Sequence, residues 1–172
     1  PRSTPLYSSA ASDVYKRQGQ GVAYMHMMIG LGALIATLGL APVSAQSTLG
    51  RLFIISAVLS SLGNHTLAMS RTLVPALVGT VIIGTSHAAF MTIATIIIQS
   101  VSPDYLRGRI TSIYLIHAGG LMSFSYFANG ILADFYNPSL ILSAGGIAFL
   151  IVVLASWIIP TPRSIYTRGA LI

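Results

Sequence analysis

The sequence has no cysteine, and only three of its 172 residues are acidic. The absence of thiols excludes disulfide frameworks and thiolate metal sites. None of the four histidines has an acidic residue at ligand spacing, and no acid is placed to orient a histidine as a general base. A glycine-rich phosphate-binding motif is also missing. We therefore expect no metal, no cofactor and no enzymatic activity.

Charge of either sign is scarce. Charged residues make up 7% of the chain, whereas soluble domains carry about 25%. Hydrophobic residues make up 54%, so most of the surface is expected to face lipid rather than water. The net charge is +6, but the basic residues are scattered and form no stripe interleaved with aromatic residues. Nucleic acid is therefore not an expected partner.

Residues 1–18 differ from the rest because they are polar, serine-rich and comparatively charged. They have neither the apolar core nor the small-residue cleavage site of a signal peptide. The stretch STPLYSSAASDVYKRQ resembles translated adapter sequence at the ends of environmental gene fragments. We predict that residues 1–18 are a non-native, disordered remnant, with a natural disordered tail as the alternative. The informative sequence would then begin at Gly19, inside a longer gene.

Long uncharged runs dominate the remainder of the chain. A helix needs about 20 apolar residues to cross the hydrocarbon core, and five runs are of about this length or longer: residues 22–41, 52–69, 73–101, 110–133 and 139–159. Helices of soluble proteins rarely include five separate runs of about 20 residues without charge. Strands of a membrane barrel would be shorter, and their apolar and polar residues would alternate. The sequence predicts an all-α, polytopic membrane bundle of five transmembrane helices within residues 19–163. A truncated cytoplasmic tail would follow at 164–172.

The arginines between the runs are distributed unevenly. If five spans alternate, one side of the membrane receives Arg51, Arg107, Arg109, Arg163 and Arg168, and the other receives Arg71 and the acidic Asp134. Cytoplasmic loops carry an excess of arginine and lysine. We therefore place the arginine-rich side in the cytoplasm.

The stretch SPDYLRGRI, residues 102–110, concentrates charge between two of the runs. Ser102 is expected to cap a helix whose first residue is Pro103, with Asp104 near its positive end. Arg107 and Arg109 are expected to pair with Asp104 or with carbonyl groups of neighbouring helices. An exposed pair of this kind contributes only about 0–1 kcal/mol, so Arg107 and Arg109 act mainly on membrane orientation.

Two stretches carry the main resemblance to a known family. IIIQSVSPDYLRGRITSIYLI at 96–116 and GILAD at 130–134 resemble the tenth and eleventh helices of the major facilitator superfamily. They are most similar to its drug- and siderophore-exporter branch, which includes the enterobactin exporter. GLGALIATLGLA at 30–41 resembles the glycine-rich eighth helix. Ser123, Ser125 and Asn129 depart from the branch's usual pattern.

The resemblance implies a particular fold and mechanism. Members have two six-helix halves around a central site and work by alternating access. The five runs would be helices eight to twelve, which make a partial C-terminal half of the fold. The partners would be the lipid bilayer, the missing N-terminal half of the same transporter and an unidentified small-molecule substrate.

Polar residues inside the predicted spans are the candidates for a substrate cavity. The residues selected are His87, Met91, His117, Ser125 and Asn129. His87 falls on the presumed tenth helix, which often lines the central cavity in the superfamily. The alternatives are a neutral His87 bonded to a neighbouring helix, and helix-to-helix hydrogen bonds made by Ser125 and Asn129.

Other residues are assigned to helix packing. Gly32, Ala36 and Gly39 form one small-residue face, and Gly145 and Gly146 are expected to serve the same purpose. Asn64 and His65, on the presumed ninth helix, are also expected to pack. Tyr114 is expected to anchor the cytoplasmic interface.

The function predicted from these features is that of part of a secondary transporter that exports small amphipathic molecules, in the bacterial cytoplasmic (inner) membrane. One alternative is the membrane subunit of another permease, which would require a coupling helix in a cytoplasmic loop. Another is a membrane scaffold protein without transport activity.

Overall fold

The computed structural model describes residues 6–43, 46–156 and 158–159, and their regular structure is entirely helical. The elements are α1 (Leu6–Leu40), α2 (Gln46–Met69), α3 (Leu73–Val101), α4 (Arg107–Phe135) and α5 (Pro138–Ser156). The predicted all-α bundle is confirmed.

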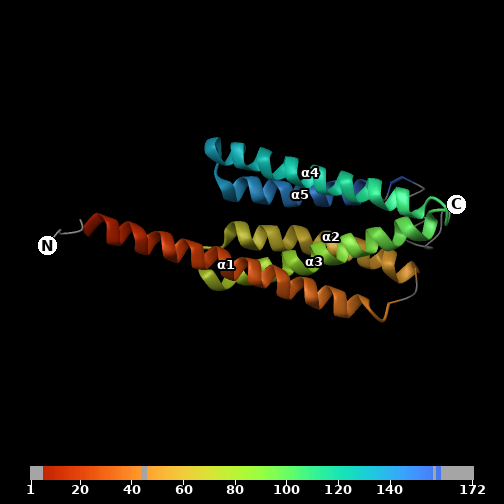
Figure 1. Ribbon diagram of the computed structural model, residues 1–172, viewed down its shortest axis with the longest axis horizontal. Helices are drawn as coiled ribbons and strands as arrows, with labels where there is room; N and C mark the ends of the chain where they lie inside the picture. The colour runs from red at the N-terminus through yellow and green to blue at the C-terminus, as the bar shows by residue number, and fades with distance from the viewer. Residues whose placement is uncertain (1–5, 44–45, 157, 160–172) are drawn as a thin grey trace.

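The five helices run back and forth along one long axis (Figure 1). The α1–α2 and α3–α4 connections lie at one end of the molecule, and the α2–α3 and α4–α5 connections lie at the other. Arg51 stands in the first turns of α2, and Arg107 begins α4. These two residues therefore belong to the same end, as the alternating arrangement of loops requires. Arg163 and Arg168 fall outside the described residues.

Four segments are long and apolar enough to cross a membrane: Gly19–Leu40, Thr48–Met69, Leu73–Val101 and Pro138–Ser156. They coincide with four of the predicted spans. The predicted span at 110–133 is helical within α4, but α4 is not among the four. It is interrupted by polar side chains, including His117, Ser125 and Asn129. The five runs were selected for their length and lack of charge, and these two properties do not reveal that α4 lacks a stretch as hydrophobic as those in the other four helices.

The N-terminal segment corrects one expectation. Residues 6–18 were predicted to be disordered, but they form the first turns of α1. No proline or glycine occurs between Leu6 and Gln18, so nothing in the backbone chemistry stops the helix from extending into this polar stretch. The non-native origin of residues 1–18 stays a prediction, and residues 1–5 and 164–172 fall outside the described part of the chain.

Helix α3 packs against both α1 and α2, and glycines bring the backbones together. A Cβ atom added to Gly84 would lie 2.8 Å from the Cα atom of Ile29 in α1, and one added to Gly32 would meet the backbone of α3 at Val81 and Thr85. On the other side of α3, a Cβ at Gly79 would lie 2.9 Å from the amide nitrogen of Leu67 in α2. Lipid tails are as apolar as the helices, so no hydrophobic force drives membrane helices together. Small residues compensate because they let the backbones pack closely.

The predicted packing faces are confirmed in part. Gly32 and Ala36 are buried against α3, whereas a Cβ at Gly39 would meet no atom within 4 Å. In α5, Gly146 is buried, and a Cβ there would lie 3.1 Å from the Cβ of Asn64 in α2. Gly145 has open space instead. Helix α5 therefore packs on α2, and α4 lies beside α5 as the outermost helix (Figure 1).

Candidate functional site: a pocket between α2, α3 and α5

A pocket of about 260 Å³ lies where α5 packs across α2 and α3. It is lined by Ser60 and Asn64 of α2, Ser86, His87, Phe90 and Met91 of α3, and Gly145, Gly146 and Phe149 of α5. Two of the predicted cavity residues, His87 and Met91, are thus brought together one helical turn apart.

Phe90 is the centre of the aromatic wall. Its ring stacks on Phe53 of α2 with the centroids 4.4 Å apart, and it meets Phe149 of α5 edge to face at 5.3 Å. Such pairs contribute about 0.5–1.5 kcal/mol beyond the area they bury. Gly146 lets α5 approach α2 closely, while the open space at Gly145 leaves the pocket unfilled. The neighbouring glycines therefore have separate roles, one in packing and one in shaping the cavity.

Polar atoms in the pocket are only partly satisfied. The Asn64 Nδ2 donates to the Ser60 carbonyl at 2.8 Å, and the Ser86 hydroxyl donates to the Ile83 carbonyl at 3.0 Å. Among the described residues, neither the His87 ring nor the Ser60 hydroxyl makes a hydrogen bond. A His87 bonded to a neighbouring helix is therefore not what the structure shows. The pocket offers hydrogen-bonding groups without partners in the described part of the protein, on an aromatic and aliphatic wall.

Met91 also connects the pocket to α4. The Tyr114 hydroxyl, on α4, donates to the Met91 sulfur at 3.2 Å. Tyr114 was expected to be an interface anchor, and here it joins two helices. Gly84, about one turn before His87 on α3, contacts Ile29 of α1 instead.

The remaining predicted cavity residues lie on α4, away from this pocket. His117 and Ser125 are exposed and are not part of its lining. Asn129 lines a separate hollow of about 240 Å³ near the α4–α5 turn, together with Ala133, Pro138, Ile141 and Leu142. The structure therefore brings together only His87 and Met91 of the five predicted residues.

Sequence reasoning missed several residues of the pocket. Asn64 was assigned to packing, and it does contact α5, but it also lines the cavity. Phe90 and Phe149 were not selected because an aromatic residue in an apolar run carries no signal of its own. His65, which follows Asn64 in the sequence, does not line the pocket. Its ring lies near α5, where the Ser143 hydroxyl is 3.5 Å from the His65 Nδ1.

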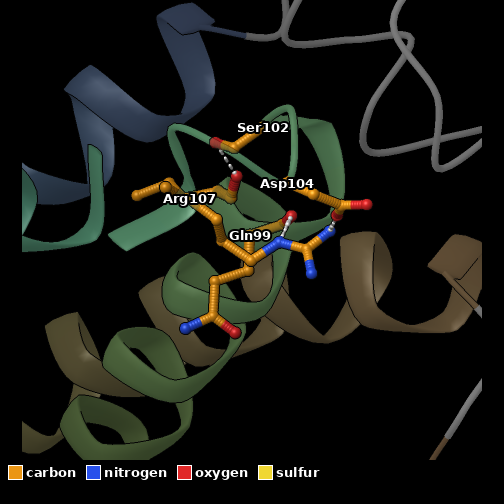
Figure 2. Close-up of polar contacts among 5 residues, drawn as sticks. Gln99, Ser102, Asp104 and Arg107 are labelled. Carbon is orange, nitrogen blue, oxygen red and sulfur yellow. Dashed lines mark hydrogen bonds and ion pairs between the residues drawn. The ribbon is translucent and has the colours of Figure 1, made fainter. Parts of the chain in front are cut away.

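The α3–α4 turn is held by Arg107. One guanidinium nitrogen, Nη2, pairs with Asp104 at 2.7 Å, and Nε donates to the carbonyl of Gln99 at 3.0 Å (Figure 2). The Gln99 carbonyl belongs to the last turn of α3, where carbonyl groups lack helical partners. Both kinds of partner predicted for Arg107 are confirmed. Arg51 and Arg109 are exposed.

The helix start predicted in this turn is wrong. Helix α4 begins at Arg107, with Leu106 as its N-cap, and Ser102 is instead the extended C-cap of α3. The Ser102 hydroxyl donates back to the Ile98 carbonyl (Figure 2). A residue that precedes proline is pushed toward an extended conformation, which ends α3 at this point. Asp104 then lies in the turn before α4 and binds Arg107 rather than the start of a helix.

A family model described as transmembrane secretion effector matches residues 14–166, which is most of the chain. The chain belongs to this family, within the major facilitator superfamily. No curated protein and no solved structure gave a significant match. The match begins inside the predicted remnant at residues 1–18, and the superfamily expected from the two resembling stretches is confirmed.

Membership in the transmembrane secretion effector family makes this chain an integral membrane protein of the transporter kind, and it points away from an enzyme. Within the described residues, no group of three or more histidine, cysteine or acidic side chains could hold a metal ion. The sequence suggested an exporter, the membrane subunit of another permease or a membrane scaffold. The family favours a transporter over the scaffold.

Proposed function

We propose that the chain forms part of a major facilitator exporter that moves small amphipathic molecules outward across the bacterial cytoplasmic membrane by alternating access. Its five helices correspond to helices eight to twelve, and further helices of the same transporter complete the central cavity. The resemblance of residues 96–116 and 130–134 to the drug- and siderophore-exporter branch supports export as the direction of transport. The family membership supports the class of transporter.

The observation that carries the proposal is the character and attachment of α4. It has no buried residue in its 29 positions, and it exposes His117, Ser125 and Asn129. Polar side chains at membrane depth face a protein interior or a water-filled path rather than lipid. Because α4 is joined to α3 by Tyr114 and Met91, its polar surface adjoins the helix that holds His87. A substrate path along α3 and α4 would explain why α4 is less apolar than its neighbours.

Membrane orientation is tested first, because the proposal places the arginine-rich turns in the cytoplasm. The chain contains no cysteine, so an introduced thiol is the only one in these 172 residues, and the carrier without the added cysteine measures any background labelling. Tyr105 in the α3–α4 turn is 82% exposed, and Tyr136 in the α4–α5 turn is 63% exposed. A membrane-impermeant maleimide should label Tyr136→Cys in intact cells and Tyr105→Cys only after permeabilisation. The reverse pattern would contradict the orientation.

Transport is tested in cells that express the complete carrier. One neutral and one cationic fluorescent amphiphile are loaded, and their loss from the cells is followed after the external dye is removed. Faster loss of at least one dye than in cells with an empty vector is expected. Equal loss of both dyes, at verified membrane expression, would remove the export proposal for this class of substrate.

A further inference from the structure

We propose that the pocket between α2, α3 and α5 binds one uncharged aromatic group that carries a hydrogen-bonding substituent, and that it excludes permanent organic cations. This inference rests on the proposed function for its role in transport and specifies the substrate class. The binding itself is a property of the residues in the pocket.

The size and the walls of the pocket fit an aromatic group. Sites for drug-sized ligands measure about 300–1,000 Å³, and this pocket of about 260 Å³ lies just below that range. It therefore accepts a ring system of one or two rings rather than a whole large molecule. Phe149 and Met91 provide an aromatic edge and a polarisable sulfur, both of which pack favourably on aromatic rings.

Charge distinguishes the class of ligand. The pocket lining contains no acidic side chain. The two acidic residues with described side chains, Asp104 and Asp134, lie in the α3–α4 turn and near the C-terminal end of α4. A cation that gave up its water in the pocket would find no carboxylate in the lining, so nothing would offset the cost of removing its hydration. One face of the Phe90 ring is stacked on Phe53, so that face is not available to bind a cation.

The unpaired polar groups select against a plain lipid tail. The Ser60 hydroxyl and the His87 ring are free to bond, and the Asn64 side-chain oxygen is not used by the hydrogen bond that its nitrogen donates. An acyl chain would leave all three without partners, which costs free energy in a low-dielectric site. A ligand with one hydroxyl, amide or similar group on its ring would satisfy at least one of them.

Ligand protection of a thiol placed in the pocket tests the proposal in the full chain, in lipid nanodiscs. Gly145 lines the pocket, and a Cβ there meets no atom within 4 Å, so Gly145→Cys should fold. Gly119 on α4 has equally open surroundings but lies outside the pocket, which makes Gly119→Cys the matched control. The rate of reaction with N-ethylmaleimide is measured, and size-exclusion profiles verify that both variants are folded.

The neutral probe 1-naphthol and the cation N-methylquinolinium share a two-ring shape, and the cation also lacks the hydroxyl group. The third probe, n-octanol, carries a hydroxyl group on an aliphatic chain and tests whether the aromatic ring is required. At about ten times its dissociation constant a ligand leaves about a tenth of the sites free, so 1-naphthol should slow Gly145→Cys about tenfold. N-methylquinolinium and n-octanol should slow it much less, and no probe should affect Gly119→Cys. Equal protection by the cation or by octanol would overturn the proposal, as would no protection by 1-naphthol.

A second variant separates hydrogen bonding from shape. Adding His87→Leu to Gly145→Cys removes one free polar group from the pocket and leaves its aromatic wall intact. The 1-naphthol concentration for half protection should rise about threefold to tenfold, the loss expected for one hydrogen bond. If it is unchanged in this variant and also in one that carries Ser60→Ala, the polar part of the proposal is wrong.

The two proposals can fail separately. If cells export a cationic dye while Gly145→Cys is not protected by 1-naphthol, the pocket assignment falls and the exporter stands. If 1-naphthol protects the thiol but no dye is exported, the pocket stands and the export function falls.

Discussion

Helices α3 and α4 have the same length, 29 residues each, yet they are held in the molecule in opposite ways. Helix α3 has six buried positions and packs on α1 and α2 through glycines that bring the backbones together. Helix α4 has no buried residue, and its described contacts with α3 include Tyr114 with Met91 and Arg107 with Gln99. Helix α3 is held by close backbone packing, whereas the described links between α4 and α3 are side-chain hydrogen bonds.

The difference has a physical consequence for stability. Backbone packing of small residues buries atoms along several turns, and it does not depend on the charge or rotamer of a single side chain. A helix attached by a few exposed hydrogen bonds belongs to the part of a protein that opens most easily. We therefore expect α4 to separate from the bundle at a lower free energy than α3.

The largest effect is expected when a methyl group is added at the α1–α3 contact. In Gly84→Ala the new Cβ would lie 2.8 Å from the Cα of Ile29, so the helices must move apart. Overpacking of this kind costs about 1–3 kcal/mol. In the matched variant Gly119→Ala on α4, the Cβ meets nothing within 4 Å, and the better helix propensity of alanine should stabilise by up to about 1 kcal/mol. Unfolding in mixed detergent micelles measures both changes.

Changes of the same sign and size in those two variants would remove the distinction between the helices. The contrast would also be lost if Gly84→Ala left the unfolding free energy unaltered, because α1 and α3 would then not be in close backbone contact.

A smaller effect is expected at the α3–α4 link. Tyr114→Phe removes the hydroxyl that donates to the Met91 sulfur at 3.2 Å. Hydrogen bonds between membrane helices contribute about 0.6 kcal/mol on average, so hydrogen exchange of the α4 amides should become faster by roughly threefold. Exchange in α1 should not change. If Met91→Leu produces the same acceleration and the double variant adds nothing more, the hydroxyl and the sulfur act as a pair.

The smallest effect is expected in the α3–α4 turn. Arg107→Gln removes both the ion pair with Asp104 and the hydrogen bond to the Gln99 carbonyl. The Arg107 side chain is 46% exposed and that of Asp104 is 91% exposed, so the loss should be about 0–1 kcal/mol and should shrink at high salt. Arg109→Gln, which changes the net charge equally, should alter stability less. Protease cleavage rates within residues 103–106 compare the two variants, and equal rates would show that Arg107 acts through charge alone.

The sequence predicted the helices well because long apolar runs without charge have few other solutions in a membrane. It also predicted both partners of Arg107, since a charged side chain beside a helix end has few partners within reach. It failed at Ser102, where the serine-proline pair looked like a helix start and proved to be a helix end. The reason is local. Ser102 precedes a proline and is therefore extended, and its hydroxyl donates back to the carbonyl of Ile98 in the last turn of α3.

The cavity was less accessible to prediction. His87 and Met91 were found because a polar or flexible residue stands out in a membrane helix. Ser60, Asn64 and Phe149 join them from two other helices, and no spacing within one run encodes that meeting. The grouping of His117, Ser125 and Asn129 with His87 relied on their being polar residues within predicted spans, which does not fix the rotation of α4 about its axis.

By itself the sequence determined that this protein is a bundle of helices in a membrane, with Arg51, Arg107 and Arg109 on one side and Arg71 on the other. Hydropathy and charge act residue by residue, so they can be read along a single chain. Only the tertiary structure decided which glycines are contacts and which leave space, and which polar groups share a pocket. Those outcomes depend on distances between helices, and a change of a few ångströms or a fraction of a turn reverses them.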